Sequence, residues 1–114
     1  MKEIKAYVRP DRLASIVSRL EQEGARDLTV TRVDAIGALA DTEKDRLRLF
    51  RNYSEKYSDI VKIEIVCADT EVNCFVGVLR EASYTGERGD GRIFVVNVER
   101  AINIRTGDEG EKAL

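Results

Sequence analysis

A glycine-rich stretch at residues 85–95, TGERGDGRIFV, offers the clearest chemistry in this chain. Its three glycines let a ligand approach the backbone closely, and successive N–H groups in such a loop can point at one anion and bind a phosphate. Arg88 and Arg92 flank the loop, and their guanidinium groups suit phosphate oxygens. Because Asp-Gly before a strand is also a strong hairpin signal, a phosphate site and a plain turn both stay open. The loop runs into a strand rather than a helix, which excludes the Walker and Rossmann fingerprints.

The length and composition set the class of protein. The 114 residues predict one domain, and a hydrophobic content of 43% is enough for a modest core. The 19 Lys and Arg against 21 Asp and Glu give a formal net charge of −2, which argues against nonspecific binding of nucleic acid or membranes by the whole surface. No apolar run is long enough to span a membrane, and the amino terminus enters a strand pattern without a signal peptide. We therefore expect a cytoplasmic protein.

Histidine is absent, and the only cysteines are Cys67 and Cys74. Two thiols without histidine are too few for a structural zinc site within one chain, so we expect no metal site. The lack of histidine also excludes a histidine-based catalytic relay. Two partly buried free thiols are the simplest interpretation, and a redox-sensitive bridge is the alternative.

The elements that must position the loop follow the order β-α-β-β-α-β. Apolar alternation predicts strands at residues 2–9, 27–37, 60–67 and 92–98. Apolar residues spaced three and four apart predict a helix over 11–24 and a second one capped by Asp69 or Thr70, with Val72, Phe75, Val76 and Leu79 on its apolar face. This order is the split βαβ, or ferredoxin-like, α+β arrangement, in which helices cover one face of the sheet. Because Val, Ile and Phe occur on both strand faces, we expect an oligomer.

The connection between Gly37 and Ile60 is about twenty residues long and contains no convincing strand. Charges of both signs alternate there with leucine and aromatic residues. Such a composition suits a segment that orders on a partner or ligand, and a solvated excursion is the alternative.

From end to end, the chain resembles the PII signal-transduction family. The resemblance rests on MKEIKAYVRPDRL at the start, LTVTRV at 28–33, VKIEIV at 61–66, TGERGDGRIFV at 85–95 and IRTGDEG at 104–110. It implies one PII-like domain over 1–114 that assembles as a ferredoxin-like homotrimer, with adenine nucleotides in the clefts between subunits. Residues of about 38–59 would be the family's T-loop, which docks on target proteins. Residues 84–92 would be its phosphate-binding loop, and 103–114 its C-terminal segment.

The resemblance also assigns roles to residues by motif position. Gly89, Asp90, Gly91 and Arg92 would hold phosphates, and Arg105 would approach them from the C-terminal segment. The full set of nucleotide-binding candidates is Thr29, Ile36, Gly37, Glu64, Val66, Thr85, Gly86, Arg88, Gly89, Asp90, Gly91, Arg92, Asn103 and Arg105. The partner-binding candidates in the long connection are Arg48, Phe50, Arg51, Tyr53 and Tyr57. Tyr53 lies at the count of the family's modified tyrosine but lacks its Tyr-Arg-Gly context, so uridylylation is not carried over.

The chain departs from the family pattern in three places, which together involve four residues. Gly37 is followed by Ala38-Leu39 instead of Arg and Gln, the Gln being the residue that helps hold magnesium and 2-oxoglutarate. Ile60 replaces a lysine that pairs with 2-oxoglutarate, and Asn103 replaces an arginine that contacts the outer phosphates. Because these changes remove charge-assisted contacts, we expect ADP or AMP to be preferred over ATP, and no 2-oxoglutarate site of the usual kind.

The predicted function is a non-enzymatic, adenine-nucleotide-sensing trimer that controls a partner through its T-loop. The partner would be a protein such as a membrane transporter or an enzyme, and no nucleic acid is expected. The departures resemble a PII-like branch that accompanies bicarbonate transporters and carboxysome genes, so bicarbonate beside the phosphates is a further hypothesis. The alternatives are a conventional nitrogen regulator that senses ATP and 2-oxoglutarate, a slow nucleotide hydrolase using Asp90 or Glu64, and an inert structural trimer.

Overall fold

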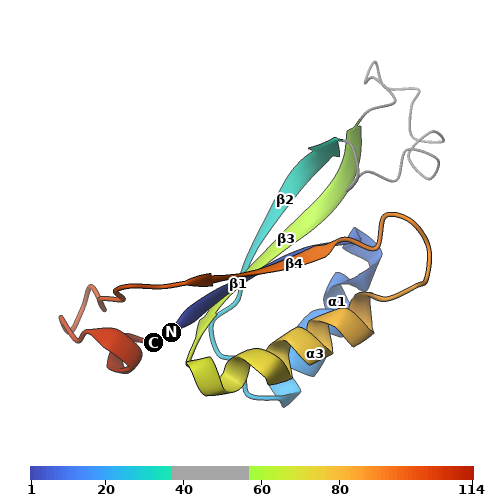
Figure 1. The fold of residues 1–114 in the computed structure, drawn as a ribbon. Helices are drawn as coiled ribbons and strands as arrows, with labels where there is room; N and C mark the ends of the chain where they lie inside the picture. Colours follow the sequence, from blue (N-terminus) through green and yellow to red (C-terminus); the bar gives the residue numbers. More distant parts are fainter. Residues whose placement is uncertain (37–56) are drawn as a thin grey trace.

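The computed structural model describes residues 1–36 and 57–114, which form a four-stranded sheet and two main helices (Figure 1). The elements are β1 (Lys2–Val8), a 3-10 turn (Pro10–Arg12), α1 (Leu13–Gln22), β2 (Thr29–Ile36), β3 (Tyr57–Cys67), a second 3-10 turn (Asp69–Glu71), α3 (Val72–Ser83), β4 (Arg92–Asn97) and a last 3-10 turn (Gly110–Ala113). The strands lie in the order β2-β3-β1-β4, and every neighbouring pair is antiparallel. The order confirms the predicted ferredoxin-like α+β fold.

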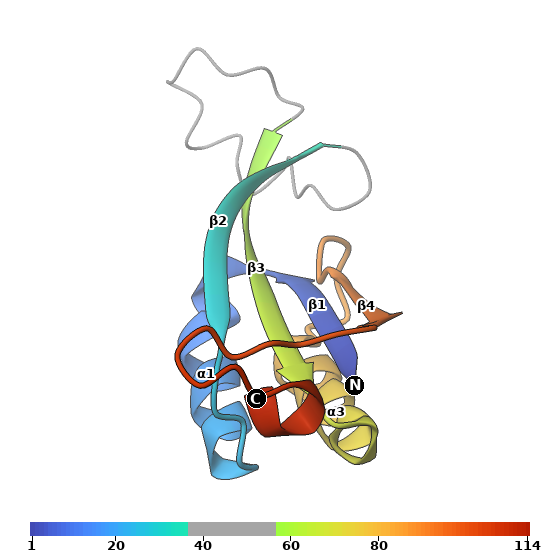
Figure 2. The same ribbon diagram turned by 90° about the vertical axis from the view of Figure 1, so that its left-hand side faces the viewer.

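The core lies between the sheet and the two helices, which cover the same face (Figures 1 and 2). Val61, Ile63 and Ile65 of β3 are buried on this face, while Lys62, Glu64 and Val66 alternate with them on the open face, as the sequence predicts. The helices contribute a buried set made of Ile16, Leu20, Phe75, Val78, Leu79 and Ala82. Each large side chain of this kind stabilises the fold by about 1.5–3 kcal/mol, which anchors the ends of the helices and strands that carry the loops.

The β2–β3 hairpin extends further than predicted. Asp34, Ala35 and Ile36 pair with residues 59, 58 and 57, so β3 begins at Tyr57 rather than at Ile60. The predicted start of the third strand at 60 is therefore wrong, and the T-loop bounds of about 38–59 remain a prediction that overlaps this strand at residues 57–59. Residues 37–56 lie outside the described part of the chain.

The predicted helix cap at Asp69 or Thr70 is also wrong. Both residues lie within a 3-10 turn, and α3 begins only at Val72. The Asp69 carboxylate instead contacts the Met1 ammonium at 2.9 Å. The Ala68 N–H donates to the Glu71 carboxylate at 3.0 Å, so a glutamate satisfies the backbone where a shorter cap residue was expected.

The segment after β4 folds back on itself instead of forming a plain tail. Ile102 and Glu109 form an isolated antiparallel bridge, and the Gly110 N–H donates to the Ala101 carbonyl at 3.0 Å. Figure 1 shows this segment at one end of the molecule and the connection from α3 to β4 at the other. Within residues 1–36 and 57–114, no helix has the length and apolar character needed to cross a membrane.

Candidate functional site

The glycine-rich loop joins the end of α3 to the start of β4, so the plain hairpin interpretation is wrong. The Asp90 carboxylate closes this loop from the inside. Its Oδ2 accepts hydrogen bonds from the Thr85 N–H at 2.8 Å and the Gly86 N–H at 3.0 Å, and its Oδ1 accepts one from the Thr85 hydroxyl. The Glu87 N–H donates in turn to the Thr85 Oγ1 at 3.2 Å. The donors of the first half of the loop are thus used within the loop.

Arg9, which the sequence analysis did not single out, supports the same carboxylate. Its side chain is only 6% exposed, and its Nε lies 3.2 Å from Asp90 Oδ1. Burial alone would raise the pKa of Asp90, but the hydrogen bonds from Thr85, Gly86 and Arg9 outweigh it and hold that pKa below its usual value. Asp90 is therefore an ionised residue facing into the loop rather than toward a ligand.

Gly91 brings the loop against β1. Its φ is +109°, and a Cβ at this position would lie 1.7 Å from the Tyr7 carbonyl oxygen. Because no side chain fits there, glycine is required for close packing of the loop on β1. Arg92 follows at once and pairs with Tyr7 in the β1–β4 ladder, so the position of Gly91 also places Arg92.

The second half of the loop presents the features of an anion site. Among residues 1–36 and 57–114, the Gly89 N–H has no acceptor, while Arg88 and Gly89 themselves form a turn. Arg88 and Arg92 are exposed on either side, and neither forms an ion pair with a described residue. A free N–H group between two guanidinium groups can bind a phosphate or another small anion.

A cavity of about 300 Å³ lies beside the loop. It is lined mainly by apolar surface from the ends of β1 and α3 and from the start of β4. Arg92 and the 70%-exposed Tyr84 stand at its edge. The loop therefore offers an apolar surface next to its charged groups.

The C-terminal candidates occupy a tight turn. The Asn103 Oδ1 accepts hydrogen bonds from the N–H groups of Arg105 and Thr106, both at 3.0 Å, and the Gly107 N–H donates to the Asn103 carbonyl at 2.8 Å. Asn103 thus shapes the turn, and the Arg105 side chain is exposed on it. The residue types alone do not predict that Asn103 stabilises the turn while the Arg105 side chain is exposed.

Three of the sheet candidates, Thr29, Glu64 and Val66, fall on the open face. Thr29 and Glu64 are direct partners in the β2–β3 ladder, and Val66 follows on the same face of β3. The Glu64 carboxylate contacts Lys62 Nζ at 2.9 Å, and this hydrogen bond and charge raise the pKa of Lys62. Ile36 is exposed at the far end of β2.

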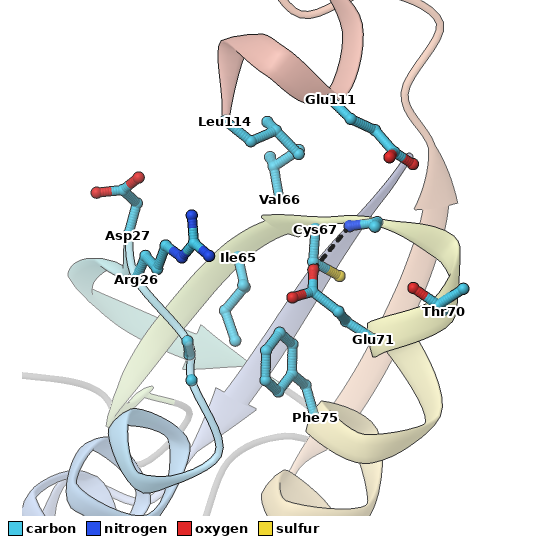
Figure 3. Close-up of a pocket in the computed structure, with 13 residues that line it drawn as sticks. Arg26, Asp27, Ile65, Val66, Cys67, Thr70, Glu71, Phe75, Glu111 and Leu114 are labelled. Carbon is cyan, nitrogen blue, oxygen red and sulfur yellow. Dashed lines mark hydrogen bonds between the residues drawn. The ribbon is translucent and has the colours of Figure 1, made fainter.

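A second cavity, of about 250 Å³, opens where β3 ends (Figure 3). Val66 lines it together with Arg26 and Cys67, and Glu111 and Leu114 of the C-terminal turn border it. Burial, together with the nearby Glu71 charge, raises the pKa of the Cys67 thiol, while the second free cysteine, Cys74, is exposed. The described residues contain no group of three His, Cys, Asp or Glu side chains suited to a metal ion.

One chain brings only part of the predicted site together. The candidates from Thr85 to Arg92 form one cluster, whereas Asn103 and Arg105 lie in the C-terminal segment at the opposite end (Figures 1 and 2). Gly37, Arg48, Phe50, Arg51 and Tyr53 lie outside the described residues, and Tyr57 begins β3. A nucleotide site containing both Arg92 and Arg105 therefore needs residues from two chains.

Comparisons with known proteins agree over nearly the whole chain. A family model described as "Nitrogen regulatory protein P-II" matches residues 1–108. The chain is 39% identical over 114 residues to "Nitrogen regulatory protein GlnK2" of Haloferax mediterranei, covering 100% of this chain and 91% of the relative. It is 35% identical over 116 residues to "Nitrogen regulatory protein GlnK" of Escherichia coli K12, covering all of both chains. Its structure is similar to that of Arabidopsis thaliana PII bound to citrate, with a TM-score of 0.80, 34% identity, and coverage of 99% of this chain and 91% of the other.

Proposed function

Because the chain belongs to the nitrogen regulatory protein P-II family, we propose that it is a non-enzymatic regulator that binds an adenine nucleotide and controls a partner protein through the connection between β2 and β3. The observation that carries the proposal is the glycine-rich loop, whose free Gly89 N–H lies between Arg88 and Arg92 in the sequence. Backbone N–H groups and guanidinium forks together suit a nucleotide's phosphates.

The regulator is a homotrimer with its nucleotide site shared between subunits. Two observations support this assembly. Arg105 belongs to the segment after β4, which lies at the opposite end of the molecule from the loop (Figure 1), so a site that uses both would take Arg105 from a neighbouring chain. The open sheet face also exposes 46% of Phe94 and 43% of Val96, while its charges are neutralised in pairs such as Lys62–Glu64. An apolar face with internally paired charges is suited to burial against other copies.

The nucleotide is ADP or AMP in preference to ATP. The Asn103 amide carries no charge and its oxygen is occupied by the turn, so it offers the outer phosphates no cationic contact. Ile60 is 6% exposed and brings no polar group to a 2-oxoglutarate carboxylate. A further hypothesis is that bicarbonate binds as a small second ligand near Arg88 or Arg92. A conventional nitrogen regulator that senses ATP and 2-oxoglutarate is the second candidate, because the relatives are named nitrogen regulatory proteins.

A hydrolase has little support at this loop. Asp90 accepts hydrogen bonds from three loop donors and contacts Arg9, so its carboxylate is not free to activate a water. Prolonged incubation with ATP and detection of released phosphate tests this point. Rapid release by the purified protein would contradict a purely regulatory role.

Calorimetric titration with AMP, ADP and ATP–magnesium, each with and without bicarbonate and 2-oxoglutarate, tests the proposal. We expect ADP or AMP to bind most tightly and Arg92→Ala to weaken ADP by about tenfold or more, because charge-assisted hydrogen bonds are strong. Arg12→Ala is the matched control, since Arg12 forms no ion pair with any described residue. Tight ATP–magnesium binding coupled to 2-oxoglutarate would favour the second candidate, and no binding of any nucleotide would overturn both.

A further inference from the structure

Arg9 is a buried cation at the base of the glycine-rich loop. It follows β1 directly and precedes the Pro10–Arg12 turn, and its carbonyl accepts a hydrogen bond from the Arg12 N–H at 3.1 Å. Its residue is 5% exposed. A buried guanidinium is costly unless it is paired and hydrogen-bonded, so its partners show where it acts.

Two of those partners belong to the loop, about eighty positions further along the chain. The Arg9 Nε donates to Asp90 Oδ1 at 3.2 Å, and its Nη2 donates to the Arg88 carbonyl at 2.7 Å. The two bonds hold the loop on both sides of Gly89. They also turn the carbonyl of Arg88 toward Arg9.

Asp90 transmits this contact to the beginning of the loop. Its carboxylate spans from Arg9 to the Thr85 N–H, the Thr85 hydroxyl and the Gly86 N–H. Arg9, Asp90 and Thr85 are thus joined by a continuous chain of hydrogen bonds, which we call the clamp. The clamp fixes both ends of the loop while the Gly89 N–H stays open.

We propose that Arg9 is a positioning residue for phosphate binding: through the Asp90–Thr85 clamp and the Arg88 carbonyl, it holds the glycine-rich loop in the one arrangement that presents its free Gly89 N–H to a phosphate. The inference rests on the proposed nucleotide-binding function of this loop. A preformed loop loses less conformational entropy when the ligand binds, so the clamp contributes to affinity without a contact to the ligand.

The experiment compares Arg9→Ala, Asp90→Asn, the double variant and the control Arg12→Ala with the unaltered chain. ADP and adenosine affinities are measured by calorimetry, and amide hydrogen exchange is measured at Thr85 and Gly86. We expect Arg9→Ala to lower the affinity for ADP by about tenfold, as the loss of a supporting residue does in other preorganised sites. Adenosine, which has no phosphate, should bind unchanged. The Thr85 and Gly86 N–H groups should exchange faster while those of β1 and β3 do not.

The double variant separates positioning from general damage. If Arg9 acts through Asp90, the double variant should bind ADP no more weakly than Arg9→Ala alone. Asp90→Asn, which nearly preserves the side chain's shape, gives the same readouts should Arg9→Ala fail to fold. Unchanged ADP affinity in both single variants, or equal losses for ADP and adenosine, would overturn the inference. Failure of the unaltered chain to bind any nucleotide would overturn the proposed function instead, and unchanged exchange at Thr85 in Arg9→Ala would then still refute the clamp.

Discussion

Replacing Gly91 by alanine should destabilise the protein far more than the same change at another glycine with a positive φ. Gly91 has a φ of +109°, and its added Cβ would lie 1.7 Å from the Tyr7 carbonyl oxygen and 2.8 Å from the carbonyl carbon. Gly24, at the end of α1, has a φ of +91° and nothing within 4 Å of its added Cβ. The pair therefore separates the cost of the backbone conformation from the cost of the clash.

The magnitude follows from two contributions. A left-handed backbone costs a residue with a Cβ about 1–2 kcal/mol, and Gly24→Ala should show this cost alone. At Gly91, an ordinary carbon–oxygen contact of about 3.3 Å requires the loop and β1 to separate by roughly 1.5 Å. Both atoms that it meets are main-chain atoms, so no side chain can move aside. The pairing of Tyr7 with Arg92 should then be lost at a further cost of about 1–2 kcal/mol, giving about 3 kcal/mol in total.

Urea unfolding measures the two variants. The protomer concentration must be the same in every sample, because assembly changes apparent stability. Gly91→Ala should also lower the affinity for ADP, because Arg92 moves with the loop. Gly24→Ala should leave the affinity for ADP unchanged. If both variants lose the same free energy of unfolding, the close approach of the loop to β1 is not a constraint and the reasoning is refuted.

Three further predictions test the pH dependence, the assembly and the core. Because its folded pKa is lowered, Asp90 stabilises the protein above about pH 4, and this contribution is lost as the pH falls through the folded value. The stability difference between the unaltered chain and Asp90→Asn should thus shrink between pH 5 and pH 3 in urea titrations, and a constant difference would contradict it. Val96→Glu should lower the mass measured by light scattering from trimer to monomer, because it places a charge on the open sheet face; an unchanged mass would exclude this face as the interface. Leu79→Ala should cost about 2–5 kcal/mol in urea unfolding, and a loss below about 1 kcal/mol would contradict its place in the core.

The secondary structure could be predicted where burial of one face makes apolar residues repeat at a regular spacing in the sequence. The alternation of Val61, Ile63 and Ile65 with Lys62 and Glu64 predicts β3 because one face meets the helices and the other does not. The glycine spacing likewise predicts an irregular loop before β4, and all three glycines there have positive φ. These features depend on neighbours in the sequence or on one side of an element.

The remaining features depend on contacts between distant residues. Tyr57 to Asp59 have no alternating pattern, and only their pairing with the end of β2 makes them a strand. Asp69 has the right type for a cap, but the Met1 ammonium binds its carboxylate. Arg9 and Asp90 are 81 positions apart, so no local pattern could have linked them.

The contact between Arg9 and Asp90 also explains how an acidic residue can lie within the loop that we propose binds a phosphate. An unpaired carboxylate beside the free N–H would repel a phosphate, at a cost that grows where water is excluded. Here the Asp90 charge faces the buried Arg9 and accepts the donors of Thr85 and Gly86. Arg88 and Arg92 are then left to set the charge near the ligand, opposed only by the exposed Glu87 among the residues of the loop itself. In the proposed site, the buried arginine therefore serves two purposes: it holds the loop in shape, and it neutralises the acidic residue that closes the loop, so that this charge does not weaken the attraction for a phosphate.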